Sequence, residues 1–322
     1  GSALLRDRMV FASDVMKKIN YEITRLARLD FDVLLVGETG VGKDLIAYEL
    51  HQRSNRRENP FIPIAMKSLT ETLIESELFG HERGAFSGAD RTKIGKLEAA
   101  FGGTVYIPEV SSLSESVQLK LLQFMQYKTI SRVGQDARKP ETKIDVRVIL
   151  ATNEALEEQV KIGRMREDFY HRITGVKLVV PPLRDRLDDI EPLANYFLSK
   201  NAASAEGDGF AFDHEVLAAF RKYRWPGNVR EMENLIKSAI AHGTNDLLRI
   251  EDFPQLTVKH SAEDYCASFL SKSFPELPEY RIAETHFKRV YFHEVLTRAG
   301  NNVAKAARAA GMTPQGFRKI LR

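Results

Sequence analysis

The chain has 322 residues, 43% of them hydrophobic, and carries 47 Lys and Arg against 44 Asp and Glu, for a formal net charge of +3. Its single cysteine, Cys266, excludes an internal disulfide and a multi-cysteine metal site, which favours a reducing cytoplasm. No apolar run reaches the length of a membrane span, so we expect two or three globular domains, a cytoplasmic location and no membrane partner.

The first predicted elements frame a glycine-rich loop. Residues 4–30 carry apolar side chains at helical spacing, and the apolar run 31–36 is typical of a buried parallel strand. The loop and the helix start that follow read Gly37, Glu38, Thr39, Gly40, Val41, Gly42, Lys43, Asp44, Leu45. A strand, a glycine loop, Gly-Lys and a helix form a phosphate-binding loop, in which backbone N–H groups, the helix N-terminus and the lysine bind phosphates. We therefore favour a nucleotide site over an unliganded turn.

Two further features precede the second core strand. Residues 61–66 predict a short strand whose prolines suit a sheet edge or a strand start. Residues 75–89 predict a helix that breaks into Gly-Ala-Phe-Ser-Gly-Ala at residues 84–89. Because glycines flank Phe86, we expect a mobile loop with this aromatic exposed at its tip, a kind of loop that contacts partners.

Polar residues follow the next two predicted strands. The strand at residues 104–110 contains Glu109, where a phosphate-loop enzyme usually has Asp-Glu, but Pro108 takes the place of the aspartate that holds magnesium. We leave open whether Glu109 is catalytic or structural. The strand at residues 144–150 ends near Asn153, and strand ends of this kind lie at the ligand edge of an open α/β sheet. Arg166 and Arg172 follow on a turn-rich surface, where pairing with neighbouring acids is the simpler interpretation from the residues alone.

The composition becomes helical from residue 183, and Arg230 follows Trp-Pro-Gly-Asn at the start of a helix. The proline-containing stretch 251–279 predicts a linker. Residues 297–322 contain no acid and six basic residues: Arg298, Lys305, Arg308, Arg318, Lys319 and Arg322.

This tail has the pattern of two packed helices. Val303, Ala306, Ala307 and Ala310 form a small apolar face, Gly311 suits the turn, and Thr313 can cap the next helix. The exposed side of that helix would present Gln315, Arg318 and Lys319. The basic, acid-free composition favours duplex DNA in the major groove over a protein-docking module.

Together these stretches resemble the bacterial enhancer-binding proteins, the AAA+ activators of sigma-54 RNA polymerase, from about residue 4 to the end of the chain. The resemblance implies an α/β AAA+ P-loop domain with a helical lid, and an all-α, Fis-like helix-turn-helix domain. It assigns residues 3–183 to the α/β part, 184–250 to the lid, 251–280 to a linker and 281–322 to DNA binding.

The resemblance also implies roles for single residues. Gly37 to Leu45 would form Walker A and bind ATP or ADP, together with Arg230 as sensor II. The catalytic set would be Glu109, Asn153 as sensor I, and Arg166 and Arg172 as arginine fingers that reach the ATP of a neighbouring subunit in a dimer or hexameric ring. Phe86 and Ser87 would contact the sigma factor of RNA polymerase, with Ser87 in place of the usual Thr. Thr313, Gln315, Arg318 and Lys319 would bind duplex DNA.

A further similarity concerns the segment before the first helix. Leu4-Leu5-Arg6-Asp7 resembles the Leu-Phe-Arg-Ser segment with which some enhancer-binding proteins bind cyclic di-GMP. An arginine can stack on guanine and pair with phosphate, so Arg6 is a candidate for that ligand. A plain linker arginine is the alternative.

Pro108 and Ser87 discriminate between three functional hypotheses. Proline has no carboxylate, so we leave open whether the site binds magnesium. We predict a DNA-binding activator that binds ATP and hydrolyses it weakly or not at all. It would work through RNA polymerase that carries another sigma factor. The enzyme alternative is an active ATPase that remodels sigma-54 polymerase. A non-hydrolysing binding module that contacts polymerase directly is the third.

Overall fold

The computed structural model describes residues 9–64, 71–136, 138, 140–202, 209–243, 246–257, 280–300, 302–313 and 315–317. It divides the chain into two compact units, Gly1–Leu256 and Thr257–Arg322, each of which is described by itself. Among the described residues, no helix combines the length and the apolar character needed to cross a membrane.

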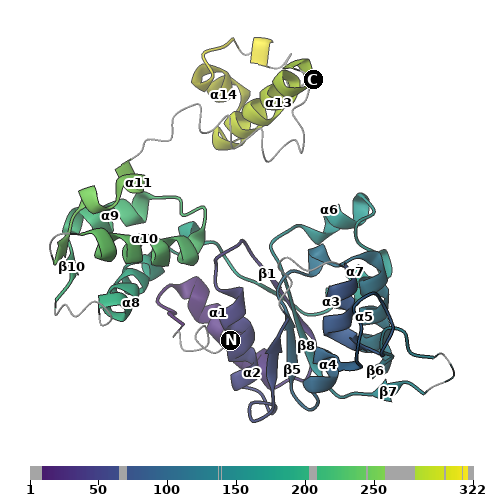
Figure 1. Cartoon of the computed structure of the whole chain (residues 1–322). Helices are drawn as coiled ribbons and strands as arrows, with labels where there is room; N and C mark the ends of the chain where they lie inside the picture. Colours follow the sequence, from purple (N-terminus) through teal and green to yellow (C-terminus); the bar gives the residue numbers. More distant parts are fainter. Residues whose placement is uncertain are drawn as a thin grey trace. The chain divides into compact units, whose positions relative to one another are not determined.

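A parallel sheet of five strands lies at the centre of the first unit (Figure 1). Neighbouring strands are parallel and follow the order β2, β5, β8, β1, β9. Their bounds are β1 Val33–Val36, β2 Phe61–Pro63, β5 Thr104–Ile107, β8 Arg147–Thr152 and β9 Lys177–Val179. The predicted α/β class is therefore confirmed. β2 lies at the sheet edge, where the absence of a proline N–H costs no hydrogen bond between strands.

Helices cover both faces of this sheet. On one face, α1 Asp14–Ala27 and α2 Lys43–Gln52 pack around Val33 and Leu35. On the other face, Leu34 contacts a core built largely from α3 Glu71–Phe79, α5 Glu115–Tyr127 and α7 Glu167–Ile173. The two cores separate because successive side chains of a strand point to opposite faces. The remaining elements here are β3 Gly80–His81, β4 Lys93–Ile94, α4 Lys96–Ala99, η2 Val110–Ser112, β6 Thr129–Ile130, β7 Thr142–Lys143 and α6 Leu156–Lys161.

The first helix begins later than its apolar spacing predicted. Residues 9–12 are not helical, and Ser13 caps α1 by accepting a hydrogen bond from the Met16 N–H at 3.3 Å. The buried carboxylate of Asp189 accepts from the N–H groups of Ala12 and Ser13 at 2.8 and 2.7 Å, and from the Ser13 hydroxyl at 2.9 Å. The prediction of a helix from residue 4 is thus wrong for residues 9–12, because these contacts hold extended backbone there.

A helical lid follows β9. Its elements are η3 Leu183–Asp185, η4 Leu187–Asp189, α8 Ile190–Ala202, β10 Ala211–Phe212, α9 His214–Lys222, α10 Asn228–His242, β11 Leu247–Leu248, η5 Ile250–Asp252 and α11 Pro254–Thr257. The ring centroid of Phe220 lies 5.2 Å from those of both Trp225 and Phe253. Because Phe253 is fully buried among these aromatic rings, the lid core extends beyond residue 250.

The second unit contains α13 Tyr280–Arg298 and α14 Val303–Ala309. Ala306 and Ala307 are fully buried, and they share a small core with Phe292 and Phe317. The φ angle of Gly311 is +65°, as the predicted turn requires. The apolar face and the turn expected from the sequence are therefore present in the described part of this unit.

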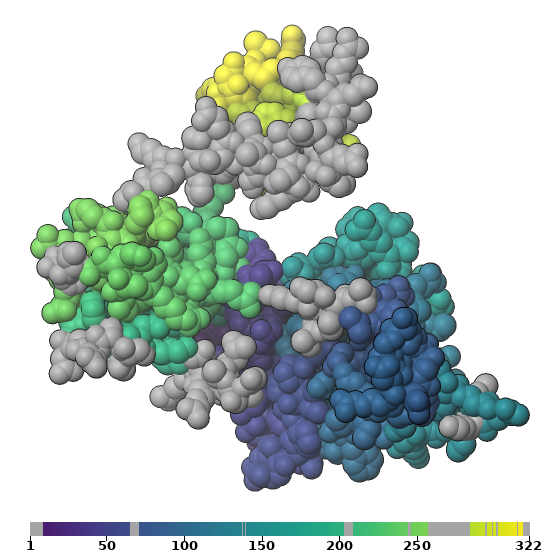
Figure 2. All heavy atoms as spheres, viewed as in Figure 1, coloured from purple at the N-terminus to yellow at the C-terminus, as the bar shows by residue number. Residues whose placement is uncertain are grey.

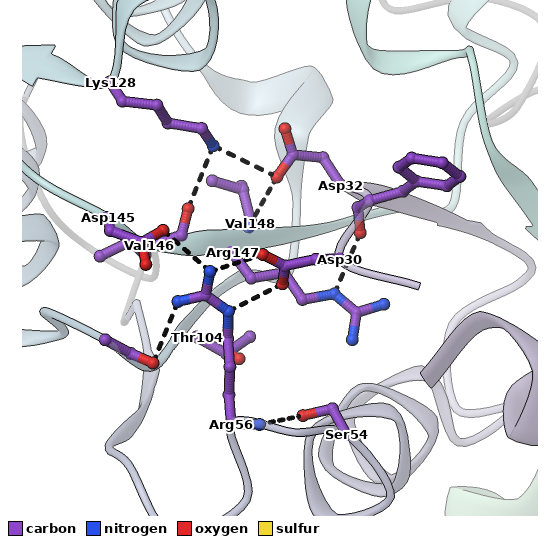
Figure 3. A network of polar contacts seen from close by, with 12 residues as sticks. Asp30, Asp32, Ser54, Arg56, Thr104, Lys128, Asp145, Val146, Arg147 and Val148 are labelled. Atoms are coloured by element: carbon purple, nitrogen blue, oxygen red, sulfur yellow. Dashed lines mark hydrogen bonds and ion pairs between the residues drawn. The ribbon is translucent and has the colours of Figure 1, made fainter. Parts of the chain in front are cut away.

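A network of polar contacts lies at the end of the sheet where β1 and β8 begin (Figure 3). Arg56 donates to the carboxylate of Asp30 at 2.6 and 2.8 Å and to that of Asp145 at 2.8 Å. Arg147 is buried in β8, where its guanidinium donates to the carbonyls of Phe31 and Leu26 at 3.0 Å each. These contacts join the chain just before β1 to the start of β8, at the opposite end of β1 from residues 37–42.

Candidate functional site

The glycine-rich loop, residues 37–42, lies between the end of β1 and the start of α2. Gly40 has a φ of +80° and Gly42 a φ of +105°, a left-handed conformation that glycine adopts without steric cost. A Cβ at Gly40 would also come within 2.2 Å of the Gly227 carbonyl oxygen in the lid. The predicted strand–loop–helix arrangement is thus confirmed, and the loop lies directly against the lid.

Lys43 is the first residue of α2 and its ammonium turns back into the loop. The Nζ atom donates to the carbonyl oxygens of Gly37 at 2.6 Å and Glu38 at 3.0 Å. Burial lowers the pKa of Lys43, and the nearby charges of Asp44 and Glu109 oppose that effect. The side-chain nitrogen of Lys43 thus lies at the place where an anion would meet the helix N-terminus.

The lid binds the loop through backbone and side-chain hydrogen bonds. The Asn228 amide donates to the Thr39 carbonyl at 3.0 Å and to the Glu38 carboxylate at 3.1 Å. The N–H groups of Val229 and Arg230 both donate to the Gly40 carbonyl, at 3.0 and 3.3 Å. These bonds place the start of α10 against the loop, so a ligand of the loop would also meet the lid.

Side chains of the lid's first turns make further contacts with the loop. Arg184 pairs with the Glu38 carboxylate, at 2.9 Å for the longer of its two hydrogen bonds. Arg186, only 4% exposed, donates to the Val41 carbonyl at 2.9 Å, and its Nε has no hydrogen-bond partner among the described residues. On the sheet side, the Asn153 amide donates to the Thr39 hydroxyl at 3.0 Å. Asn153 and Arg230, both predicted as site residues, therefore lie at the loop.

Asp44 bridges the sheet and the lid. The Tyr106 hydroxyl, from β5, donates to Asp44 Oδ1 at 2.6 Å, and Arg230 Nη2 lies 3.9 Å from Asp44 Oδ2. Tyr106 is 2% exposed, and burial together with the Asp44 charge raises the pKa of its phenol above the ordinary value. The phenol thus remains a proton donor, and it fixes one oxygen of the carboxylate.

The loop from Thr39 onward, Asn153, Arg186 and Arg230 line one cleft of about 370 Å³. Its polar side contains Thr39 to Asp44, Glu109, Asn153 and Arg230, and Pro108 also lines it. Its apolar side is built from Met9, Val10, Met16, Leu193, Phe197 and Val229. A cleft with phosphate-binding groups at one end and an apolar wall at the other has the size and the character of a nucleotide site.

The two candidate arginine fingers do not lie at their own chain's loop. Arg166 donates to Asp168 at 3.1 and 2.9 Å and to Glu115 at 3.0 Å, so the simple pairing with a neighbouring acid is present. Arg172 donates to the Met125 carbonyl at 2.8 Å and lies 3.7 Å from Asp32. Asp32 immediately precedes β1, at the opposite end of that strand from the loop.

The loop at residues 84–89 differs from the expected exposed tip. Phe86 is half-buried, and its ring packs edge-on against His81 with centroids 5.0 Å apart. His81 is itself held by the Ser76 side chain at 2.7 Å. The prediction of an exposed aromatic is therefore wrong in this structure, because His81 offers a packing partner that the flanking glycines do not reveal. Ser87 is exposed.

A hairpin of β6 and β7 lies beside that loop and projects from the surface (Figure 2). Arg132, in the hairpin, donates to Glu82 at 3.2 Å and to Glu98 at 3.1 Å. The backbone of Glu82 donates to the Val133 carbonyl at 2.9 Å. The base of the loop and the hairpin are thus joined by backbone and ionic contacts.

The predicted DNA-contacting residues are only partly within the described chain. Thr313 caps the following turn, with its hydroxyl accepting from the Gly316 N–H at 3.2 Å, and Gln315 is exposed. Arg318 and Lys319 lie outside the described residues. Arg6, the candidate residue for cyclic di-GMP, also lies outside them.

Four residues of the cleft region escaped the sequence analysis: Tyr106, Arg184, Arg186 and Asn228. Asn228 had a local signal, because it belongs to the Trp-Pro-Gly-Asn turn, and its φ of +54° is a conformation that asparagine tolerates. Tyr106 had none, since a tyrosine in a β-strand is ordinary. Its role depends on which helix lies over that face of the sheet.

Comparisons with known families agree with the fold and the site. A model described as a sigma-54 interaction domain matches residues 9–179, and one described as an AAA+ ATPase lid domain matches residues 184–266. The structure of NtrX from Brucella abortus in complex with ADP is similar, with a TM-score of 0.71 and 27% identity, over 98% of this chain and 69% of that one. Its ATP complex has a TM-score of 0.70 and 28% identity, over 99% of this chain and 69% of that one.

Curated relatives are similar over most of this chain. The nitric oxide reductase transcription regulator NorR2 of Cupriavidus necator is 38% identical, over 96% of this chain and 61% of the relative. The Nif-specific regulatory protein of Azotobacter vinelandii is also 38% identical, over 93% of this chain and 55% of the relative. The chain thus spans between about half and two thirds of the length of these relatives.

Proposed function

The chain belongs to the sigma-54-dependent enhancer-binding activators of the AAA+ class, and from this premise we propose that it activates transcription from DNA under the control of a bound nucleotide. The observation that carries the proposal is the cleft in which Lys43, Asn153 and Arg230 converge on one glycine loop. The related NtrX structures with ADP and ATP support a nucleotide as the ligand. Nucleotide titration of the chain and of its Lys43→Ala variant tests it.

Hydrolysis is proposed to be weak or absent. Pro108 lines the cleft where a metal-holding aspartate would stand, and it leaves Glu109 as the acid at the end of β5. ATP would then act as a structural ligand that sets the geometry of the lid and the loop. The second candidate function is an active ATPase that remodels sigma-54 polymerase, and the family membership favours it.

RNA polymerase with a sigma factor is the proposed protein partner, and the loop containing Phe86 and Ser87 is its proposed contact. Phe86 packs on His81 here, so reaching a partner requires it to leave that ring. Because weak hydrolysis would not remodel sigma-54 polymerase, we propose that the partner polymerase carries another sigma factor.

The cyclic di-GMP hypothesis concerns Arg6, which lies outside the described residues. Calorimetry with that dinucleotide, under conditions where ATP binds, tests it.

Self-association is proposed to be heterologous, with Arg166 and Arg172 directed at the phosphates of the next subunit's nucleotide. Repeated head-to-tail contacts of this kind close into a ring when the rotation allows. Arg166 is half-buried and pairs with Asp168 and Glu115, whereas Arg172 is exposed and pairs with Asp32. The nucleotide of a neighbour must therefore compete with these carboxylates.

We predict that ATP increases the mass measured by light scattering, and that Arg166→Ala or Arg172→Ala removes the increase. Each variant deletes one cation from the shared site while leaving the cleft of its own chain intact. Arg221→Ala is the matched control, because Arg221 is an exposed lid arginine that pairs with Glu191. A chain that stays monomeric at high concentration with and without ATP, and still activates transcription, contradicts the proposal.

DNA binding is proposed for the second unit. We expect duplex affinity to fall steeply with salt, because Lys and Arg contacts to phosphates release counterions. Arg318→Ala with Lys319→Ala should weaken binding and reduce the slope of log affinity against log salt by about two. Gel shift or fluorescence anisotropy over a salt series measures both, and an affinity that does not change with salt argues against a DNA interface.

A further inference from the structure

The acidic groups of the cleft do not form the usual magnesium site. In phosphate-loop proteins, the metal is held by a hydroxyl directly after the loop lysine and by an aspartate at the end of a neighbouring strand. Those two positions are Asp44 and Pro108 here. The described residues contain no group of three or more His, Cys, Asp or Glu that could hold a metal ion.

Asp44 is engaged by protein groups on both of its oxygens. Oδ1 accepts the Tyr106 hydroxyl at 2.6 Å, and Oδ2 lies 3.9 Å from the Arg230 guanidinium. Because Tyr106 is buried in β5, its hydroxyl cannot swing away without leaving a buried polar group unpaired. Asp44 is therefore oriented toward the sheet and the lid.

The acid in the loop itself is engaged in the same way. Glu38 accepts hydrogen bonds from the Arg184 guanidinium and from the Asn228 amide. Two further carboxylates line the cleft, Glu109 and Glu233. Glu233 accepts hydrogen bonds from Lys200 at 3.3 Å and from Lys237 at 2.7 Å. Magnesium in a nucleotide site is bound through one or two carboxylates together with phosphates and water, so proline at position 108 removes one of the few protein ligands that such an ion has.

Positive groups, in contrast, gather at the loop. Lys43 begins α2, Arg230 extends from the lid, and the loop's left-handed glycines leave backbone N–H groups available at a helix N-terminus. We propose that this cleft binds a nucleoside di- or triphosphate without a divalent metal, and that Lys43, Arg230 and the loop N–H groups neutralise the phosphates. The inference rests on the proposed function, because it requires a nucleotide in this cleft.

Asp44 distinguishes this proposal from a metal-dependent site. Without a metal, its carboxylate is a negative charge next to the phosphates, and Asp44→Asn should tighten ATP binding by about threefold to tenfold by removing that repulsion. If Asp44 ligated magnesium, the same variant would bind ATP more weakly in magnesium. Pro108→Asp adds a carboxylate beside Glu109 and should convert the site to metal-dependent binding.

The test is calorimetric titration of ATP into the full chain, in buffer with magnesium and in buffer with EDTA. We expect wild-type dissociation constants to agree within about threefold, and those of Pro108→Asp to differ by at least about tenfold, with tighter binding in magnesium. Asp44→Asn should bind ATP about threefold to tenfold more tightly than the wild type in EDTA. Pro108→Ala is the matched control for Pro108→Asp, because it removes the proline and supplies no carboxylate.

Each result of the titration leads to a distinct conclusion. A wild-type affinity that falls tenfold or more in EDTA, together with weaker binding by Asp44→Asn in magnesium, overturns the metal-free proposal while leaving the nucleotide site intact. A wild-type chain that binds no ATP in either buffer overturns the proposed nucleotide site, and the metal-free proposal with it. Equal affinities in both buffers support both proposals.

Discussion

The Pro108→Asp variant is expected to turn over ATP about two to three orders of magnitude faster than the natural chain in the presence of magnesium. The aspartate would restore a carboxylate at the end of β5, beside Glu109, and with it the charge stabilisation and water alignment that a metal supplies. Pro108 directly follows the last residue of β5 and lines the same cleft as Asp44 of α2.

Phosphate release measures the turnover, and Pro108→Ala is the matched control. Alanine frees the φ angle and restores the backbone N–H that proline lacks, but it supplies no carboxylate. It therefore separates the effect of the proline backbone from the effect of metal binding. If Pro108→Ala is as fast as Pro108→Asp, the limitation lies in the backbone that presents Glu109. Natural turnover comparable to that of Pro108→Asp, with transcription only from sigma-54 polymerase, supports the enzyme alternative.

The Lys43→Ala variant is expected to lose nucleotide affinity by about 30- to 150-fold, because it removes charge-assisted hydrogen bonds worth about 2–3 kcal/mol. Lys43 is the only lysine among the described residues that line the cleft. The variant also loses the hydrogen bonds of Lys43 to the Gly37 and Glu38 carbonyls. The lid bonds from Asn228, Val229 and Arg230 do not involve this lysine and should continue to hold the loop.

A fluorescent nucleotide titration measures this loss, with a thermal melt of each variant to verify folding. Lys161→Ala is the matched control, because Lys161 is an exposed lysine of α6 that pairs with Glu158 and does not line the cleft. Equal affinity of Lys43→Ala and the natural chain would show that the nucleotide, if bound, sits elsewhere.

Local patterns were sufficient to predict the loop, the sheet class and the small-residue core of the tail. The phosphate loop is encoded within one contiguous stretch, where glycines set the backbone and Lys43 follows directly. The edge position of β2 was predictable for a similar reason, because a proline has no N–H to donate and so suits a sheet edge or a strand start. Ala306 and Ala307 had to be buried, since their spacing puts both on one helix face.

The tertiary structure alone decided which side chains meet across long stretches of chain. Asn228 reaches Glu38 from 190 residues away, and Tyr106 reaches Asp44 from 62 residues away. Those contacts follow from the strand order β2, β5, β8, β1, β9 and from the docking of the lid on the loop, and no local pattern encodes either. The same reason explains Phe86, because flanking glycines describe the freedom of its own backbone but not the His81 ring that it packs against.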